Sequence, residues 1–137
     1  METTKLYRPV GLKEMELIAE LDYNAFPPRL EWQPIFYPVT NQQYAEQIAF
    51  EWNTVDEFSG FIGIVTAFEV NSDFLKKYEI QNVGDKNHNE LWIPSEDLNE
   101  FNFNIVDGIQ IVNVYFTDRS LVSENKGLKD KLDSFRK

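Results

Sequence analysis

Residues 60–70 constrain the fold of this chain more than any other segment, because nearly every position is apolar. Alternate side chains of a strand point to opposite faces. One phase holds Ile62, Ile64, Thr66, Phe68 and Val70, and the other holds Phe61, Val65 and Ala67. A strand with apolar residues in both phases needs a cover on both faces. The sequence therefore predicts a central strand with other elements packed on either side of it.

Helices and short strands alternate around this segment. Apolar residues recur at helical spacing in 12–21, 42–52 and 95–103, and Asn41 is a favourable N-cap for the second of these helices. Short strands are expected at 5–8, 35–37, 80–83, 91–93 and 109–116. We therefore predict a single α+β domain over residues 1–116, with a split, mixed β-sheet and helices packed on it.

Two further segments stand out by composition. Residues 22–38 contain four prolines and several large aromatic side chains, which predicts an ordered, packed loop rather than a long helix. Residues 117–137 form a polar tail of mixed charge, with Leu128, Leu132 and Phe135 spaced for one or two amphipathic turns. We expect this C-terminal tail to be mobile or only loosely docked.

Charge and residue usage exclude several kinds of function. The chain has no cysteine, so disulfides, thiolate metal sites and a cysteine nucleophile are excluded. Its formal net charge of −10 repels phosphate backbones, and we expect no nucleic-acid partner. The chain shows neither a long apolar stretch nor the pattern of a signal peptide, so we expect a cytoplasmic protein without a membrane partner.

The sequence lacks the common signatures of phosphate and metal sites. No glycine-rich phosphate loop is present, and His88 is the only histidine. A zinc site built on two or three histidines is therefore impossible, and we expect no metal cofactor.

Three short segments carry the residues best suited to chemistry. Arg8 ends the first expected strand, Tyr37 and Thr40 lie around the second, and Glu90 opens a later strand. An arginine can bind a pyrophosphate through two hydrogen bonds, and an aromatic ring can stack on a nicotinamide. A carboxylate can orient ribose hydroxyls and stabilise an oxocarbenium-like transition state. Arg29, beside Pro28, is a second candidate for ligand contact.

The order of these segments resembles the ADP-ribosyltransferase superfamily. Most of the chain is also similar to small bacterial proteins that carry the label "ADP-ribosylation/crystallin J1". The similarity lies in LYRPVG at 6–11, FPPRL at 26–30, QPIFYPV at 33–39, ELWIP at 90–94, and the pair Phe101 and Asn102. The resemblance implies an ADP-ribosyltransferase-like fold and a function linked to NAD or ADP-ribose.

The resemblance also implies roles for individual residues. Arg8 and Glu90 would be catalytic, and Arg8, Tyr37 and Thr40 would contact NAD. An alignment with the RES-type toxins of the same superfamily makes Glu46 the acidic residue instead, and the sequence leaves this choice open. The position two residues before Glu90 holds His88, where classical protein-modifying transferases carry glutamate or glutamine.

A second hypothesis is a non-catalytic acidic module that binds another protein. The net charge and the aromatic, proline-rich segment at 26–38 motivate it. It predicts that Arg8 and Glu90 lie apart and that aromatic side chains form an exposed patch. The NAD hypothesis predicts instead that Arg8, Tyr37 and Glu90 converge on one cleft.

Overall fold

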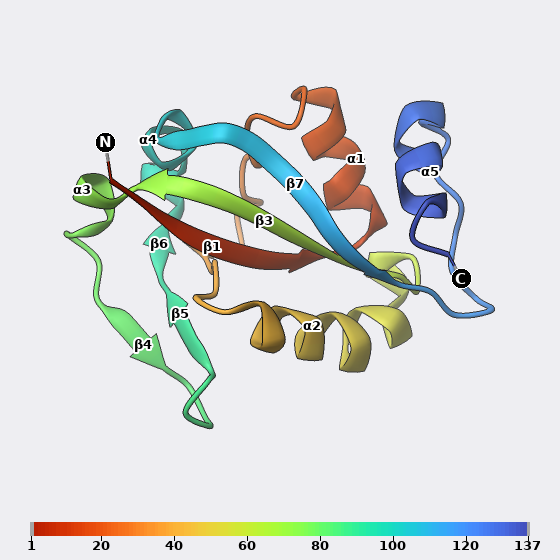
Figure 1. The fold of residues 1–137 in the computed structure, drawn as a ribbon, viewed down its shortest axis with the longest axis horizontal. Helices are drawn as coiled ribbons and strands as arrows, with labels where there is room; N and C mark the ends of the chain where they lie inside the picture. Colours follow the sequence, from red (N-terminus) through yellow and green to blue (C-terminus); the bar gives the residue numbers. More distant parts are fainter. Residues whose placement is uncertain (1, 137) are drawn as a thin grey trace.

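A three-stranded antiparallel sheet forms the centre of the computed structural model, which describes residues 2–136 (Figure 1). Its order is β1 (Thr3–Val10), β3 (Gly63–Asn71) and β7 (Ile105–Tyr115). The middle strand β3 is the one that the sequence predicts to be covered on both faces. Ile64 and Phe68 pack into the larger core, while Val65 packs into a smaller core on the opposite face. The single α+β domain and its doubly buried strand are therefore confirmed.

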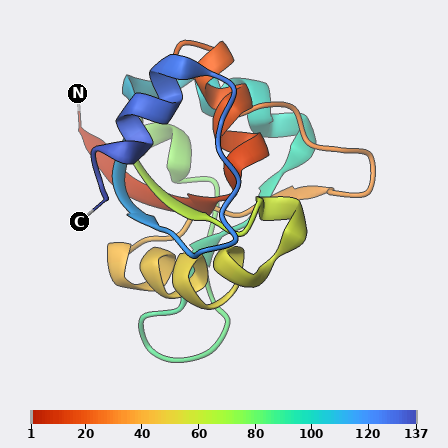
Figure 2. The same ribbon diagram turned by 90° about the vertical axis from the view of Figure 1, so that its right-hand side faces the viewer.

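Helices cover both faces of this sheet (Figure 2). The helix α2 (Gln42–Glu51) packs on one face, and Asn41 caps it by accepting a hydrogen bond from the Tyr44 amide. The other face is covered by α1 (Leu12–Glu20), α4 (Leu98–Phe103) and α5 (Lys126–Asp133). Gly63 lets α2 approach closely, because a Cβ at this position would collide with the backbone of Ala49.

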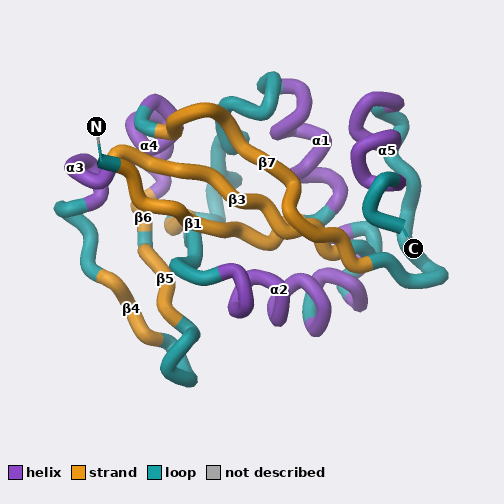
Figure 3. The backbone as a smooth tube through the Cα atoms, in the orientation of Figure 1, coloured by secondary structure: helices purple, strands orange, loops and turns teal. Residues whose placement is uncertain are grey.

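The remaining elements are short. Two ribbons pair β2 (Ile35–Phe36) with β6 (Ile93–Pro94) and β4 (Ile80–Asn82) with β5 (Asn89–Leu91). The short helices are α3 (Ser72–Leu75) and the 3₁₀ turns η1 (Asn53–Val55), η2 (Glu57–Ser59) and η3 (Ser95–Asp97). The β4–β5 ribbon projects beyond the end of the sheet, on the side of α2 (Figure 3).

The prediction of a mixed sheet is wrong, because every strand pair among residues 2–136 is antiparallel. Both α1 and α2 lie between β1 and β3 in the chain, so β3 starts at the end where β1 finishes. Val10 accordingly pairs with Ile64. A single helix in this connection would have returned the chain to the start of β1 and produced a parallel pair.

The proline-rich segment is ordered, as the sequence predicts, and aromatic packing holds it. Phe26 and Phe36 are buried with ring centroids 5.0 Å apart, and they contact Phe68 and Phe101 at 4.9 and 5.3 Å. The side chain of Asn102 accepts from the Phe26 amide at 2.9 Å and donates to its carbonyl at 3.0 Å. These contacts fix the loop that carries Arg29.

Two strand boundaries differ from the expected ones. Strand β1 continues through Pro9 to Val10, beyond the expected end at Arg8. The N–H and C=O groups of alternate residues point to the same edge of a strand, and those of Tyr7 point to Val39, away from β3. Those of Pro9 therefore also point away from β3, so its missing N–H breaks no hydrogen bond between β1 and β3. The last strand was expected from residue 109, but β7 begins at Ile105, and Asp107 and Gly108, with φ of 63° and 79°, form a bulge within it.

The segment around Val39 joins the sheet to the β4–β5 ribbon. Val39 exchanges two backbone hydrogen bonds with Tyr7, at 2.8 and 2.9 Å. On its other side Val39 bridges to Glu90, and the Leu91 amide donates to the Pro38 carbonyl at 2.9 Å. The three segments chosen from the sequence are therefore neighbours in space.

The C-terminal tail is docked more closely than expected. Leu128 and Leu132 of α5 are 0% and 4% exposed and belong to the main core. The hydroxyl of Ser123 donates to Glu16 of α1 at 2.8 Å, which ties the tail to the neighbouring helix. The amphipathic turns were expected, but a mobile or loose tail is not what the structure shows. No helix within residues 2–136 is long and apolar enough to cross a membrane.

Substitution of Leu128 by Ala tests this docking. We expect a loss of about 2–5 kcal/mol in the free energy of unfolding, because the substitution leaves a cavity in the core. The matched control is Leu121→Ala, whose side chain is 58% exposed and should change the stability by less than about 0.5 kcal/mol. Urea titration monitored by tryptophan fluorescence measures both values. Equal, small effects would show that α5 is not part of the cooperative core.

Candidate functional site

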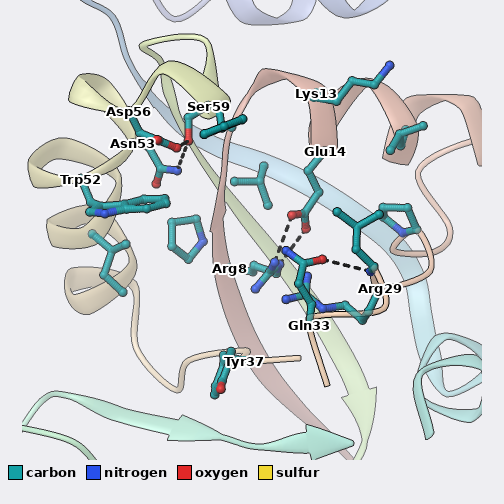
Figure 4. Close-up of a pocket in the computed structure, with 18 of the residues that line it drawn as sticks. Arg8, Lys13, Glu14, Arg29, Gln33, Tyr37, Trp52, Asn53, Asp56 and Ser59 are labelled. Carbon is teal, nitrogen blue, oxygen red and sulfur yellow. Dashed lines mark hydrogen bonds and ion pairs between the residues drawn. The ribbon is translucent and has the colours of Figure 1, made fainter. Parts of the chain in front are cut away.

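A cleft of about 950 Å³ lies beside the free edge of β1 (Figure 4). One wall comes from α1 and the loop at residues 27–33, and the other comes from the end of α2 with η1 and η2. Its polar or aromatic lining residues include Arg8, Glu14, Arg29, Tyr37, Trp52, Asn53, Asp56, Phe58, Ser59, Glu90 and Trp92. The volume falls within the range of ordinary small-molecule sites.

Arg8 lies in the middle of the cleft and is held by Glu14. The Arg8 Nε and Nη2 atoms donate to the Glu14 carboxylate at 2.7 and 3.0 Å, and the side chains are only 11% and 24% exposed. The turn at Gly11 makes this pair possible, because it brings the first turn of α1 back beside β1. A Cβ at Gly11 would collide with the backbone of Ser59, so this turn also sets the distance between the two walls.

Arg29 supplies a second guanidinium from the loop at residues 27–33, and it points toward Arg8 (Figure 4). The Cζ atoms of Arg8 and Arg29 lie 4.7 and 5.8 Å from the centroid of the same Phe36 ring. Burial lowers the pKa of Arg29, and the charge of Arg8 lowers it further, while Glu14 and Tyr37 oppose the shift. Arg29 forms no ion pair within residues 2–136, and its buried Nε has no hydrogen-bond partner there. This part of an acidic protein therefore carries a local excess of positive charge.

Glu90 lines the cleft and lies on β5, which pairs with the side of Val39 that faces away from Tyr7. Both of its carboxylate oxygens accept hydrogen bonds. Oε1 accepts from Trp92 Nε1 at 2.8 Å, and Oε2 accepts from the Tyr44 hydroxyl at 3.3 Å. Burial raises the pKa of Tyr44, and the charge and hydrogen bond of Glu90 raise it further. The Tyr37 ring packs edge-on against Trp92, with centroids 6.3 Å apart. The carboxylate is thus held in one orientation next to two aromatic rings.

A chain of hydrogen bonds stabilises the wall formed by the end of α2 with η1 and η2. Asn53 donates to the Ser59 hydroxyl at 2.9 Å, and Ser59 donates to Asp56 at 2.6 Å (Figure 4). Asn53 and Ser59 are 4% and 5% exposed, so the network is internal to this wall. It fixes the two 3₁₀ turns that carry Trp52 and Phe58 at the mouth of the cleft.

The structure brings four of the residues singled out from the sequence together and leaves two outside. Arg8, Arg29, Tyr37 and Glu90 all line the cleft. Thr40 does not line it. Its hydroxyl lies 3.4 Å from the Asn89 carbonyl and its amide bonds to the same atom. Glu46 is on α2 outside the cleft, where Gln42 and Asn113 donate to it. Between the two acidic candidates, only Glu90 faces the cleft.

Sequence reasoning missed the opposite wall and the partner of Arg8. Glu14 could have been found from the strand–glycine–helix order, which returns the chain past Arg8 after six residues. Trp52 falls at the end of the helix expected over 42–52, but it follows the last turn of α2 and is 59% exposed. Asn53 and Ser59 carry no signal in the sequence, because the 3₁₀ turns that position them have no distinct pattern.

The described residues contain no group of three acidic, histidine or cysteine side chains placed to hold a metal ion. His88 lies at the tip of the β4–β5 ribbon, not in the cleft. Its ring stacks on Tyr44 at 4.4 Å, and its Nε2 lies 3.1 Å from the Gln47 Oε1. The histidine thus helps to seat the ribbon on α2.

Comparison with protein-family models, curated proteins and solved structures gave no match for this chain. The function of the cleft is therefore inferred from its residues.

A double-mutant cycle tests the pairing of Arg8 with Glu14. We expect Arg8→Met and Glu14→Gln each to destabilise the protein, because each leaves the other charge largely buried without a partner. The coupling free energy should be about 1–3 kcal/mol, measured by urea unfolding at neutral pH. The matched control is the exposed pair Asp73 and Lys76, with 83% and 76% exposure, for which a coupling below about 0.5 kcal/mol is expected. Additive single effects at Arg8 and Glu14 would contradict the pairing.

Proposed function

We propose that the cleft binds NAD or ADP-ribose and that the protein acts on, or responds to, the ADP-ribosyl group. The observation that carries this proposal is the meeting of Arg8, Arg29, Tyr37 and Glu90 in one cleft. They come from segments far apart in the sequence. The alternative of a purely protein-binding module predicts that Arg8 and Glu90 lie apart, and this part of it does not fit the cleft.

The charge distribution suits a pyrophosphate. Arg8 is already paired with Glu14, whereas Arg29 has its guanidinium beside Arg8 and lacks a carboxylate partner among the described residues. Arg29 is therefore the main anion contact in this proposal, and Arg8 adds positive charge from a fixed position. Arginine forms paired hydrogen bonds to phosphate oxygens, and these are stronger where water is partly excluded.

The other groups suit the rest of such a ligand. Tyr37 and Trp92 are 40% and 44% exposed and offer aromatic surface for a nicotinamide or adenine ring. Glu90, held by Tyr44 and Trp92, is placed to accept hydrogen bonds from ribose hydroxyls. If the protein transfers ADP-ribose, the same carboxylate would stabilise the positive charge that develops on the ribose as nicotinamide leaves.

Calorimetric titration with NAD and with ADP-ribose tests binding. We expect saturable binding that is weakened about tenfold or more in Arg29→Met, because a charge-assisted contact to phosphate is lost. We expect Glu14→Gln to strengthen binding by about threefold, because it removes a negative charge beside both arginines. The matched control is Arg119→Met, an exposed arginine that packs over Phe61 outside the cleft and should bind as the unmodified protein does.

Whether Glu14→Gln strengthens or weakens ligand binding is the more decisive of these measurements. Weaker binding in Glu14→Gln together with unchanged binding in Arg29→Met would show that the ligand does not place an anion at these arginines. The absence of binding to either compound at millimolar concentration would rule out the NAD proposal.

Glu90→Gln separates binding from transfer. If the protein splits NAD, this variant should lose at least about 100-fold in the rate of nicotinamide release, because the carboxylate charge is absent in the transition state. Its affinity for ADP-ribose should change by less than about fivefold, since the amide can still form hydrogen bonds. Glu46→Gln, on the same protein but outside the cleft, should release nicotinamide at the unmodified rate. The reverse result would identify Glu46 as the acidic residue and favour the RES-type alignment.

A further inference from the structure

The segment at residues 52–59 has the reverse of the usual polarity. Its large apolar side chains, Trp52, Val55 and Phe58, are 59%, 69% and 93% exposed. Its small polar side chains are buried instead. Asn53, Thr54 and Ser59 are 4%, 7% and 5% exposed and are three of the five buried polar residues in the described chain. Apolar groups are ordinarily buried when the backbone allows it, so this arrangement indicates an interaction surface.

Hydrogen bonds inside the segment hold its buried polar side chains, although Asn53 Oδ1 has no partner among the described residues. Asn53, Ser59 and Asp56 form the chain described above, and the Thr54 hydroxyl donates to the Phe50 carbonyl. The amide of Phe61 donates to the Asp56 carbonyl at 3.1 Å. The hydrogen bonds of the buried polar side chains thus stabilise a backbone conformation in which the large apolar side chains face solvent.

The charged side chains within this segment are all acidic. The chain has no lysine or arginine between Arg29 and Lys76, but seven aspartate or glutamate residues. Three of them, Glu51, Asp56 and Glu57, lie within the segment or directly before it. A partner that covers Trp52, Val55 and Phe58 therefore meets these three carboxylates, whereas Arg8, Lys13 and Arg29 line the adjoining cleft.

We propose that residues 51–58 form a docking surface for a protein segment that combines apolar anchors with flanking lysine or arginine. Charge complementarity selects this partner over two others. A second copy of the chain would bring its acidic groups against the same acidic groups, and an anionic lipid surface would be repelled. Trp52 and Phe58 also line the cleft, so a docked segment would lie at its mouth. This inference does not depend on what the cleft binds.

Selection of random twelve-residue peptides displayed on phage, with the full-length protein as target, tests the proposal. We expect enriched peptides to carry a net positive charge and at least two large apolar residues. Their affinity, measured with synthetic copies by fluorescence anisotropy, should fall about tenfold or more in Val55→Ser and in Phe58→Ser. The affinity should also fall as the salt concentration rises from about 50 to about 500 mM, because salt screens the attraction between the basic peptide and the carboxylates.

Two controls make the outcome decisive. The matched variant is Phe103→Ser, which removes an apolar side chain that is 89% exposed on α4, and it should bind the peptides unchanged. Val55 does not line the cleft, so its variant separates docking from ligand binding. Enriched peptides that are acidic or that bind Val55→Ser and Phe58→Ser equally well would overturn the proposal, and so would a lack of enrichment. Sedimentation that shows a dimer, lost in Val55→Ser, would identify a second copy as the occupant and overturn it as well.

Discussion

The burial of Phe26 and Phe36 against Phe68 and Phe101 holds the part of the molecule on which the cleft depends. The proline-rich segment has few backbone hydrogen bonds of its own, since proline cannot donate one. Aromatic packing and the two hydrogen bonds between Phe26 and the Asn102 side chain take their place. Because the same segment continues into Tyr37 and Val39, fixing two phenylalanines also fixes the strand contact to β1 and the position of Arg29.

Charge in the cleft follows from local geometry and not from overall composition. The chain has a net charge of −10, yet Arg8 and Arg29 meet over one phenylalanine ring with one carboxylate beside them. Low exposure keeps water from screening these charges fully. Two guanidinium groups and one carboxylate thus meet at one corner of the cleft, although its charged lining residues as a whole are three basic and three acidic side chains.

The sequence predicted the elements that show a periodic pattern, but it did not predict the relative direction of the strands. The doubly buried strand, the helix capped by Asn41 and the ordered proline-rich segment follow from patterns within ten to twenty residues. The antiparallel arrangement does not, because it depends on how α1 and α2 together turn the chain between β1 and β3. For the site, Arg8, Arg29, Tyr37 and Glu90 were named from the sequence. Glu14 and the 3₁₀ turns were missed, because tertiary contacts alone bring them to the cleft. The ADP-ribosyltransferase likeness of the fold stays a prediction.

Pro9 has a consequence for the solubility of the protein. The edge of β1 beside the cleft lies open after the contact of Tyr7 with Val39, and open edges tend to recruit strands from other molecules. Pro9 offers no N–H to such a strand, and its ring obstructs close pairing. The protein can therefore keep a roomy, partly apolar hollow next to a bare sheet edge without that edge becoming a starting point for aggregation.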